Sequence, residues 1–343
     1  MKTPTVGFAM SLYNQSAWVE EAIDSALSQT VPPEQIVVVD DGSTDDSRDR
    51  VRALSSPRVK LVESNRSGVS NVLNTAVKHL DTDLIAIQAC DDVSFPERIE
   101  RQLESLVSNA STAVFGQPRV IDELSDDMPD EHAREFFAIH DEADDVLRRF
   151  FYAGNFLCAS SALLDRSSFL KFGGFHPGLL HLQDFRLWIQ FASIVEPIVL
   201  TDRIVKYRRT SYGGNLSSST NDKRMRAEFA YVYRQFFDHC SLERLKNAFP
   251  EVANVTSSES ARIQLLLNHK DHLVYQEGVE RLLIALESRN GELPKIGQAE
   301  LTATDIFEIV GKSDVDRREH LSVIAQHLRN VAPWMLTDEN KAL

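Results

Sequence analysis

The apolar positions in the amino-terminal third of the chain follow two alternating patterns. Short runs rich in apolar residues are typical of strands that are covered on both faces. They occupy residues 6–10, 35–39, 84–87 and 113–115, and a further strand is predicted over 59–62. Between these runs, apolar residues recur every three or four positions, which predicts helices over 19–27, 45–54, 69–80 and after Pro96. Ser16 is the expected N-cap of the first helix. This alternation favours an α/β fold with a mostly parallel, doubly wound sheet.

The later part of the chain first continues this pattern and then changes. Helices are predicted over 146–151 and 182–192, a strand or a pair of short elements over 154–166, and a strand over 198–200. After residue 221, strand patterns nearly vanish, and helical spacing covers 222–239, 260–268, 274–286, 303–310 and 314–328. The sequence therefore predicts two domains, an α/β domain over 1–220 and a smaller all-α domain over 221–343.

The stretch Leu84–Arg98 (LIAIQACDDVSFPER) places two adjacent acids, Asp91 and Asp92, where a buried strand should leave the sheet. Ligands of open α/β sheets lie in the crevice outside the carboxyl ends of the strands. Carboxylates are the oxygen ligands that divalent cations prefer, and such cations commonly accompany phosphates. Acids also stabilise a helix N-terminus through its dipole. The stretch by itself leaves a metal site and a purely structural role equally open.

Charge and composition narrow the classes of function. The net charge of −14 argues against a general nucleic-acid binder or a constitutive membrane-surface protein, because both need basic faces. Cys90, Cys158 and Cys240 are too few and too widely spaced for a disulfide framework or a zinc site. Residues 1–5 lead directly into the first strand, and no apolar run approaches the roughly 20 residues of a spanning helix. We therefore expect a cytoplasmic protein with no signal peptide.

The turn after the first strand bears on competing nucleotide-binding folds. A dinucleotide-binding Rossmann domain and a P-loop both need glycines there, and residues 11–15 contain none. Later in the chain, Arg208 and Arg209 precede a Gly/Ser-rich segment over 211–220, a pattern that suits either a closing diphosphate clamp or a plain linker. Asp184, in the first turn of its predicted helix, is either a functional acid or a helix-capping one.

Taken in order, these motifs resemble the family 2 glycosyltransferases, which are inverting enzymes of GT-A fold that use nucleotide sugars. The resemblance covers about the first 220 residues. The stretch VVVDDGSTDDS at 37–47 carries the most specific part of it. The other matching segments are 11–14 with 28–30, SNRSGVSNVLN at 64–74, ACDDVSFPER at 89–98, LQDFRL at 182–187, and Tyr207-Arg208 with 215–217.

The resemblance implies a role for each matching residue. Tyr13 would stack on the base of the donor, and Asp41 would accept from its imide N–H, which suits uracil or thymine. Asp184 would be the general base. The other implied contacts are Ser11 with the nucleotide, Asp91 with the ribose or the metal's water shell, Asp92 with a Mn²⁺ or Mg²⁺ ion, and Arg208 or Arg209 with the diphosphate. The chain departs from the family pattern at Leu73, Ala89, Arg186 and Thr210.

The sequence thus predicts an inverting glycosyltransferase that moves a sugar from a UDP- or dTDP-linked donor to a hydroxyl of a glycan or lipid-linked acceptor, as in cell-surface polysaccharide synthesis. The alternative is an inactive relative that binds a nucleotide sugar or a partner protein. A nucleotidyltransferase is disfavoured, because the Gly-rich, basic opening of those enzymes is missing. Peripheral membrane contact and homo-oligomerisation through 221–343 both stay open, whereas a nucleic-acid partner is not expected.

Overall fold

The computed structural model describes residues 3–109, 111–131, 137, 145–210, 222–288, 295–296 and 299–312. The chain divides into two compact units, Met1–Glu228 and Phe229–Leu343. The segment 211–220 and the predicted helix 314–328 lie outside the described residues. Within the parts of the chain that the structure describes, no helix is long and apolar enough to cross a membrane.

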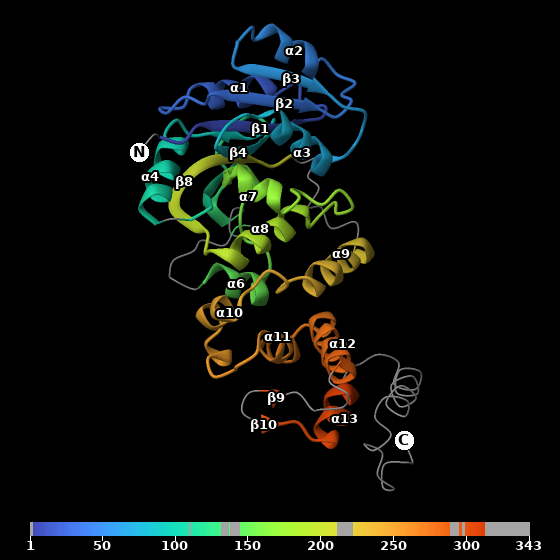
Figure 1. Cartoon of the computed structure of the whole chain (residues 1–343). Coiled ribbons are helices and arrows are strands. Elements are labelled where there is room, and N and C mark those ends of the chain that lie inside the picture. The colour runs from blue at the N-terminus through green and yellow to red at the C-terminus, as the bar shows by residue number, and fades with distance from the viewer. Residues whose placement is uncertain are drawn as a thin grey trace. The chain divides into compact units, whose positions relative to one another are not determined.

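The first unit contains a mixed sheet, which among the described residues has eight strands in the order β3-β2-β1-β4-β7-β6-β8-β5 (Figure 1). The half formed by β3, β2, β1 and β4 is parallel, β7 runs antiparallel to both of its neighbours, and β6 and β8 are parallel to each other. The strands are β1 Val6–Leu12, β2 Gln35–Asp40, β3 Val59–Glu63, β4 Leu84–Ala89, β5 Val93–Ser94, β6 Ala113–Ile121, β7 Leu163–Asp165 and β8 Ile198–Arg208.

The parallel half forms where the sequence predicts it, because its central strands are apolar on both faces. Every residue of β2 after the first is buried, and β1 and β4 are almost as fully covered. In the register of these strands, Ser11 of β1 pairs with Val39 of β2 and with Ala89 of β4. The carboxyl ends of the three strands are therefore level, so the polar residues that follow them share one edge of the sheet.

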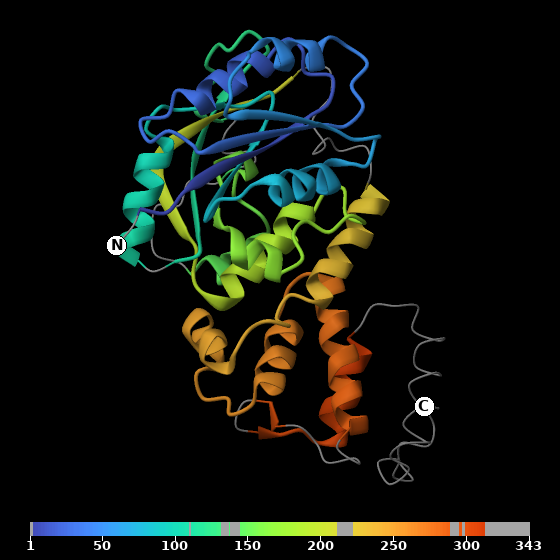
Figure 2. The same ribbon diagram turned by 45° about the horizontal axis from the view of Figure 1, so that its top comes forward.

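Helices cover both faces of this sheet, as Figure 2 shows from a second direction. Their apolar stripes form the core; in α1, for example, Val19, Ala22, Ile23 and Ala26 are buried. The prediction that Ser16 caps α1 was wrong, because the helix begins after Trp18 and has no side-chain cap. The helices are α1 Val19–Leu27, α2 Ser47–Ala53, α3 Val69–His79, α4 Arg98–Asn109, α6 Val146–Ala153, α7 Arg166–Lys171 and α8 Gln183–Ile194, with a 3₁₀ turn at Ala159–Ser161.

Strands β6 and β8 are longer than their apolar runs predict. They pair with each other in parallel, from Val114 with Ile198 to Ile121 with Arg208, with irregular register around Gln117. The additional residues include Arg119, Arg203 and Lys206. These polar residues interrupt the apolar pattern. They are tolerated because pairing with a neighbouring strand stabilises the extension without burying every side chain.

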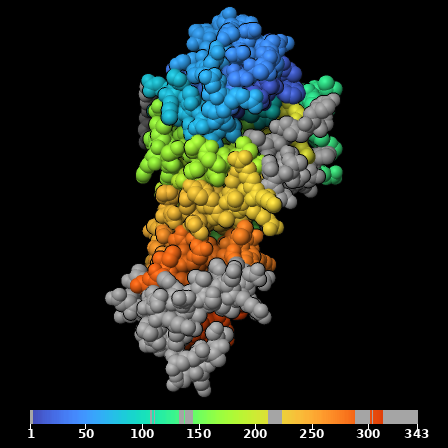
Figure 3. All heavy atoms as spheres, turned by 90° about the vertical axis from the view of Figure 1, so that its right-hand side faces the viewer, coloured from blue at the N-terminus to red at the C-terminus, as the bar shows by residue number. Residues whose placement is uncertain are grey.

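The second unit is mainly helical. A core of Ile263, Leu282, Leu286, Ile306 and Val310 holds its later helices together. Beside the helices, the described residues include a short antiparallel pair, β9 Lys295–Ile296 and β10 Ala299–Glu300. The helices are α9 Asp222–Arg234, α10 Leu242–Ala248, α11 Ser258–Leu267, α12 His272–Ser288 and α13 Ala303–Gly311, with a 3₁₀ turn at Pro250–Val252. The boundary between the units falls within α9, which reaches the molecular surface on the face shown in Figure 3 (yellow).

Candidate active site

The ends of β1, β2 and β4 bring three predicted nucleotide contacts to one edge of the sheet. The backbone carbonyl of Ser11 accepts a hydrogen bond from Cys90 N (3.1 Å), and Asp41 N donates to Leu12 O (2.8 Å). Asp91 follows directly after Cys90. Ser11, Asp41 and Asp91 are each half-buried, so their side chains are not sealed inside the core.

Asp41 orders the loop that precedes α3. One carboxylate oxygen accepts from Ser67 N (2.6 Å) and the other from Gly68 N (2.9 Å). Gly68 has a φ of +84°, a left-handed conformation that glycine adopts without strain. Asp41 therefore joins the SNRSG motif to the DDGS motif, and the contact with the base stays a prediction.

Tyr13 carries a partner that the sequence reasoning missed. The guanidinium of Arg66 lies 4.6 Å from the centroid of the Tyr13 ring, and Arg66 also donates to the Tyr13 hydroxyl (2.5 Å). Tyr13 is 38% exposed, so part of its ring remains available. Arg66 lies in a loop without periodicity, and only its position three residues after the end of β3 marks it as close to the other strand ends.

The adjacent acids Asp91 and Asp92 differ in exposure. Asp92 is only 2% exposed, and its two oxygens accept from the Ser160 hydroxyl and from Arg208 N (2.9 Å). Burial, followed by the nearby Asp91 charge, raises the pKa of Asp92 to about 8. Burial also raises the pKa of Asp91, although Asp91 remains half-buried. The positive charge of Arg208 opposes both shifts, but burial outweighs it.

A divalent cation fits this turn through Asp91. Mg²⁺ keeps several waters and takes one or two carboxylates together with phosphate oxygens, and Asp91 supplies such a carboxylate. Asp92 fits the predicted direct contact less well, because protein donors hold both of its oxygens. Among the residues that the structure describes, no three His, Cys, Asp or Glu side chains form a metal-binding group. Most ligands of the cation would therefore come from the donor diphosphate and water.

Arg208 does not lie open to a diphosphate, contrary to the prediction. Its side chain is fully buried and donates to Asp91 O (2.8 Å), Asp122 O (2.8 Å), Ser125 Oγ (3.0 Å) and Glu21 Oε2 (2.7 Å). These acceptors occupy the guanidinium, so Arg208 fixes the end of β8 against the acidic turn. The neighbouring Arg209 is half-buried, and its backbone N donates to Ile121 O (2.9 Å).

Asp184 lies in the first turn of α8 and is half-buried. Its carboxylate accepts from Phe185 N (2.7 Å) and from Asn155 Nδ2 (3.1 Å). Burial raises the pKa of Asp184 to about 6, although these hydrogen bonds favour the ionised form. A carboxylate with this pKa is ionised at neutral pH and is a stronger proton acceptor than an exposed aspartate.

A single short segment connects Asp184 with the acidic turn. Asn155 at one end of the segment donates a hydrogen bond to Asp184. Ser160 at the other end donates to Asp92 and accepts a hydrogen bond from Ala89 N (3.2 Å). Five residues of fully extended chain span at most about 18 Å, and the 3₁₀ turn at the end of this segment shortens it further. The partners of the base candidate and of the acidic turn are therefore at most about 18 Å apart along the chain.

The departures from the family pattern have structural explanations. Leu73 is 7% exposed and packs on the inner face of α3, where an arginine would need a partner. Ala89 adds no third charge beside two acids whose pKa values are already raised. Arg186 donates to Gln190 one turn further along α8 (3.3 Å). Thr210, in place of a closing histidine, is half-buried.

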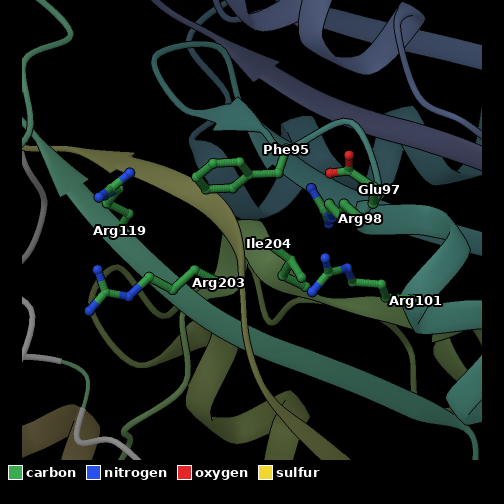
Figure 4. A pocket seen from close by; sticks show the side chains of 7 residues that line it. All are labelled: Phe95, Glu97, Arg98, Arg101, Arg119, Arg203 and Ile204. Atoms are coloured by element: carbon green, nitrogen blue, oxygen red, sulfur yellow. The ribbon is translucent and has the colours of Figure 1, made fainter.

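A hollow of about 300 Å³ lies elsewhere on the first unit (Figure 4). None of the candidate site residues lines it. Its exposed arginines are already paired, Arg101 with Asp202, Arg119 with Asp127 and Arg203 with Asp130. We therefore do not place the donor there. The lining residues are Phe95, Glu97, Arg98, Arg101, Arg119, Arg203 and Ile204.

Known proteins are similar to part of this chain. A relative from Rickettsia felis, an uncharacterized glycosyltransferase, is 28% identical over 224 residues, which are 64% of this chain but only 36% of the relative. The Escherichia coli UDP-Glc:alpha-D-GlcNAc-diphosphoundecaprenol beta-1,3-glucosyltransferase WfgD is 29% identical over 121 residues, which are 35% of this chain and 48% of that protein. The chain thus spans about a third to a half of the length of these relatives.

Structural comparison extends the likeness of the fold to most of the chain. The crystal structure of S. aureus TarS 1–349 in complex with UDP superposes with a TM-score of 0.55 at 14% identity, and the match covers 94% of this chain and 92% of that one. At this level of identity the match concerns the fold alone. The family model "Glycosyl transferase family 2" matches residues 8–173. Residues 8–173 are therefore similar to the family 2 glycosyltransferases, and the sheet of the first unit has the GT-A fold.

Proposed function

We propose that the chain is an inverting glycosyltransferase that moves a sugar from a UDP- or dTDP-linked donor to an acceptor hydroxyl. The observation that carries the proposal is the half-buried Asp184, whose pKa is raised to about 6 and whose partner Asn155 lies on the segment that also binds the acidic turn. A proton acceptor and a diphosphate site near it are the two parts that this displacement needs.

The reaction follows from that arrangement. The acceptor oxygen attacks the anomeric carbon and loses its proton to an Asp184 oxygen. The bond from the anomeric carbon to the diphosphate breaks on the opposite side, its electron pair leaves with the nucleoside diphosphate, and the configuration inverts. The hydrogen bonds from Phe185 N and Asn155 Nδ2 keep the Asp184 carboxylate oriented. A cation at Asp91, when bound, neutralises the charge that develops on the leaving diphosphate.

Donor binding falls to the residues at the strand ends. Tyr13, with Arg66 beside its ring, provides an aromatic surface for the base, and Asp41 provides an acceptor for the imide N–H of uracil or thymine. Ser11 and Asp91 lie beside the proposed nucleotide, and Arg209 is the diphosphate contact that we retain. The UDP complex of TarS and the UDP-Glc donor in the name of the E. coli relative support this choice of nucleotide.

The acceptor and the setting rest on the relatives. The E. coli protein is named for a diphosphoundecaprenol-linked acceptor, and we propose a lipid-linked or other glycan acceptor in cell-surface polysaccharide synthesis at the cytoplasmic side of the membrane. We assign catalysis to residues 1–220, and acceptor contact or self-association to 221–343. An inactive nucleotide-sugar binder is the alternative.

A two-step experiment tests this proposal. Calorimetry with UDP, dTDP, GDP and ADP, with and without Mn²⁺, should show binding of a pyrimidine diphosphate strengthened by the metal. UDP release from a panel of UDP-sugars, with a lipid-linked acceptor, should then detect turnover that Asp184→Asn abolishes without loss of UDP binding. Asp202→Asn, at an exposed acid paired with Arg101, is the matched control and should retain turnover. Binding without turnover on any donor would favour the inactive relative.

A further inference from the structure

Glu228 of α9 binds the backbone just before α8. Its carboxylate accepts from three successive backbone N–H groups, those of Leu180 (3.0 Å), His181 (2.8 Å) and Leu182 (3.0 Å). Glu228 is 5% exposed, and these partners belong to the same compact unit. Leu182 is the N-cap residue of α8, and Asp184 lies two residues further on. Glu228 thus holds the entry to the helix that carries the proposed base.

The charge of Glu228 is suited to this contact. Burial raises the pKa of its carboxyl, but the three N–H donors and Arg224 (3.2 Å) outweigh burial, so the pKa is lowered overall. Glu228 is therefore ionised across the neutral range. A carboxylate that accepts several backbone N–H groups makes charge-assisted bonds that are about twice as strong as neutral ones. The loop at 180–182 consequently depends on the negative charge of this side chain.

The connection preceding α8 needs such an anchor. It contains Gly173 and Gly174 with φ values of +82° and +70°, and Gly178 follows. Asn74 fixes its middle by exchanging hydrogen bonds with the backbone of Phe175 (2.8 and 2.9 Å). Glu228 fixes its end. The direction in which α8 leaves the loop, and so the place of its first turn, follows from the contact with Glu228.

We propose that Glu228 is a positioning residue for the Asp184 base, an inference that rests on the proposed function. Glu228 acts on Asp184 through the loop and touches no substrate. A displacement of about 1 Å at a catalytic group, caused by a change outside the reacting centre, can lower the rate by about 100-fold. The donor contacts other than Arg209 come from β1, β2, β4 and the loops that follow strands, so the effect should fall mainly on the chemical step. The helix that leads into residues 229–343 thereby sets the geometry of the base.

The test compares Glu228→Gln with Glu277→Gln in the full chain. Glutamine keeps the shape of Glu228 but removes the charge and one acceptor oxygen. Glu277 is similarly buried, at 8% exposed, and pairs with Arg234 and Arg281 in the second unit. Glu228→Gln should lower kcat about 10- to 100-fold while the Kd for UDP stays within about twofold. Glu277→Gln should alter the melting temperature and leave kcat unchanged.

A second readout is independent of turnover. The midpoint of Asp184 titration, followed by carboxyl ¹³C NMR, should fall from about 6 toward the ordinary range of an exposed aspartate in Glu228→Gln, because a loosened first turn admits water. An unchanged midpoint, or equal losses of kcat and UDP affinity, would overturn the positioning role. Absence of turnover in the unmodified protein would instead defeat the proposed function, and the Asp184 midpoint would still decide the role of Glu228.

Discussion

Replacement of Arg208 by methionine distinguishes a diphosphate clamp from a structural anchor. The family resemblance implies the clamp, whereas the structure shows a buried guanidinium whose acceptors are Glu21, the carbonyls of Asp91 and Asp122, and Ser125. Methionine retains much of the apolar length of the side chain and removes every donor. The expected result is therefore a loss of stability, with UDP affinity affected only secondarily.

The magnitude follows from what the substitution leaves behind. Two carbonyl oxygens lose their partner inside the protein, and a buried unpaired acceptor costs about 1–3 kcal/mol. Both hydrogen bonds are only partly buried, so the lower end applies to each. The Glu21 side chain is 41% exposed and regains water, so its ion pair contributes about 1 kcal/mol or less. The sum is about 2–3 kcal/mol. With a urea m-value of about 3 kcal/mol/M, the midpoint should fall by roughly 1 M.

Urea unfolding followed by tryptophan fluorescence is the assay, because the Arg208 guanidinium lies 5.5 Å from the centroid of the Trp18 ring. Arg209→Met, at the adjacent arginine, is the matched control and should weaken UDP binding with a midpoint shift under about 0.3 M. If Arg208→Met unfolds at the same urea concentration as the unmodified protein and fails to bind UDP, Arg208 is the clamp and the anchoring role is wrong.

Four further predictions concern the acids and Arg66. Because Asp184 must be ionised to accept a proton and its pKa is about 6, kcat/KM should fall as the pH drops through 6; a limb near pH 4 would exclude Asp184 as the base. In calorimetry, UDP binding should no longer depend on Mn²⁺ in Asp91→Ala, whereas it should still depend on Mn²⁺ in Asp92→Asn. If Asp92 binds the metal directly, the two variants should show the opposite results. The pKa of Asp92 in the folded state, near 8, exceeds its value in the unfolded state, so ionisation of Asp92 lowers the free energy of unfolding. As the pH rises from about 5 to 8, the unmodified protein should therefore lose stability relative to Asp92→Asn. Arg66→Ala should weaken UDP binding about two- to fivefold, as expected for a lost cation–π support of about 0.5–1 kcal/mol, and an equal loss in Arg58→Ala would point to general charge instead.

The parts of the fold that sequence reasoning predicted are those in which burial alone decides the structure. The central residues of strand β2 are apolar because helices cover both of its faces, so the strand can be recognised from its own residues alone. Strand β8 extends to Arg208 because β6 lies beside it, and a partner in another part of the chain leaves no signal in the local pattern. The N-cap of α1 was wrong for a related reason, since Ser16 N donates to Asp45 instead of starting the helix.

The residues of the candidate site likewise fall into those that sequence reasoning could find and those that it could not. Ser11, Asp41 and Asp91 follow strand ends, and strand order places them on one edge without knowledge of any side-chain contact. Asn155 and Glu228 could not be found in this manner, because each matters only through a hydrogen-bond partner 29 or more residues away. The burial of Arg208, which argues against its predicted contact with the diphosphate, was not visible in the motif.

Asp91 and Asp92 show why a sequence motif alone does not determine the chemical role of each of its residues. Asp92 accepts from Arg208 N, and the Arg208 side chain in turn donates to the carbonyl of Asp91, so the end of β8 and the acidic turn hold each other. Ser160 ties the same carboxylate to the segment that reaches Asp184 through Asn155. A buried carboxyl group with these donors is retained because its removal would release three segments at once. Asp92 thus joins the end of β8 and the acidic turn to the segment that carries Asn155. We expect the more exposed Asp91 to bind the ligand and the buried Asp92 to support it.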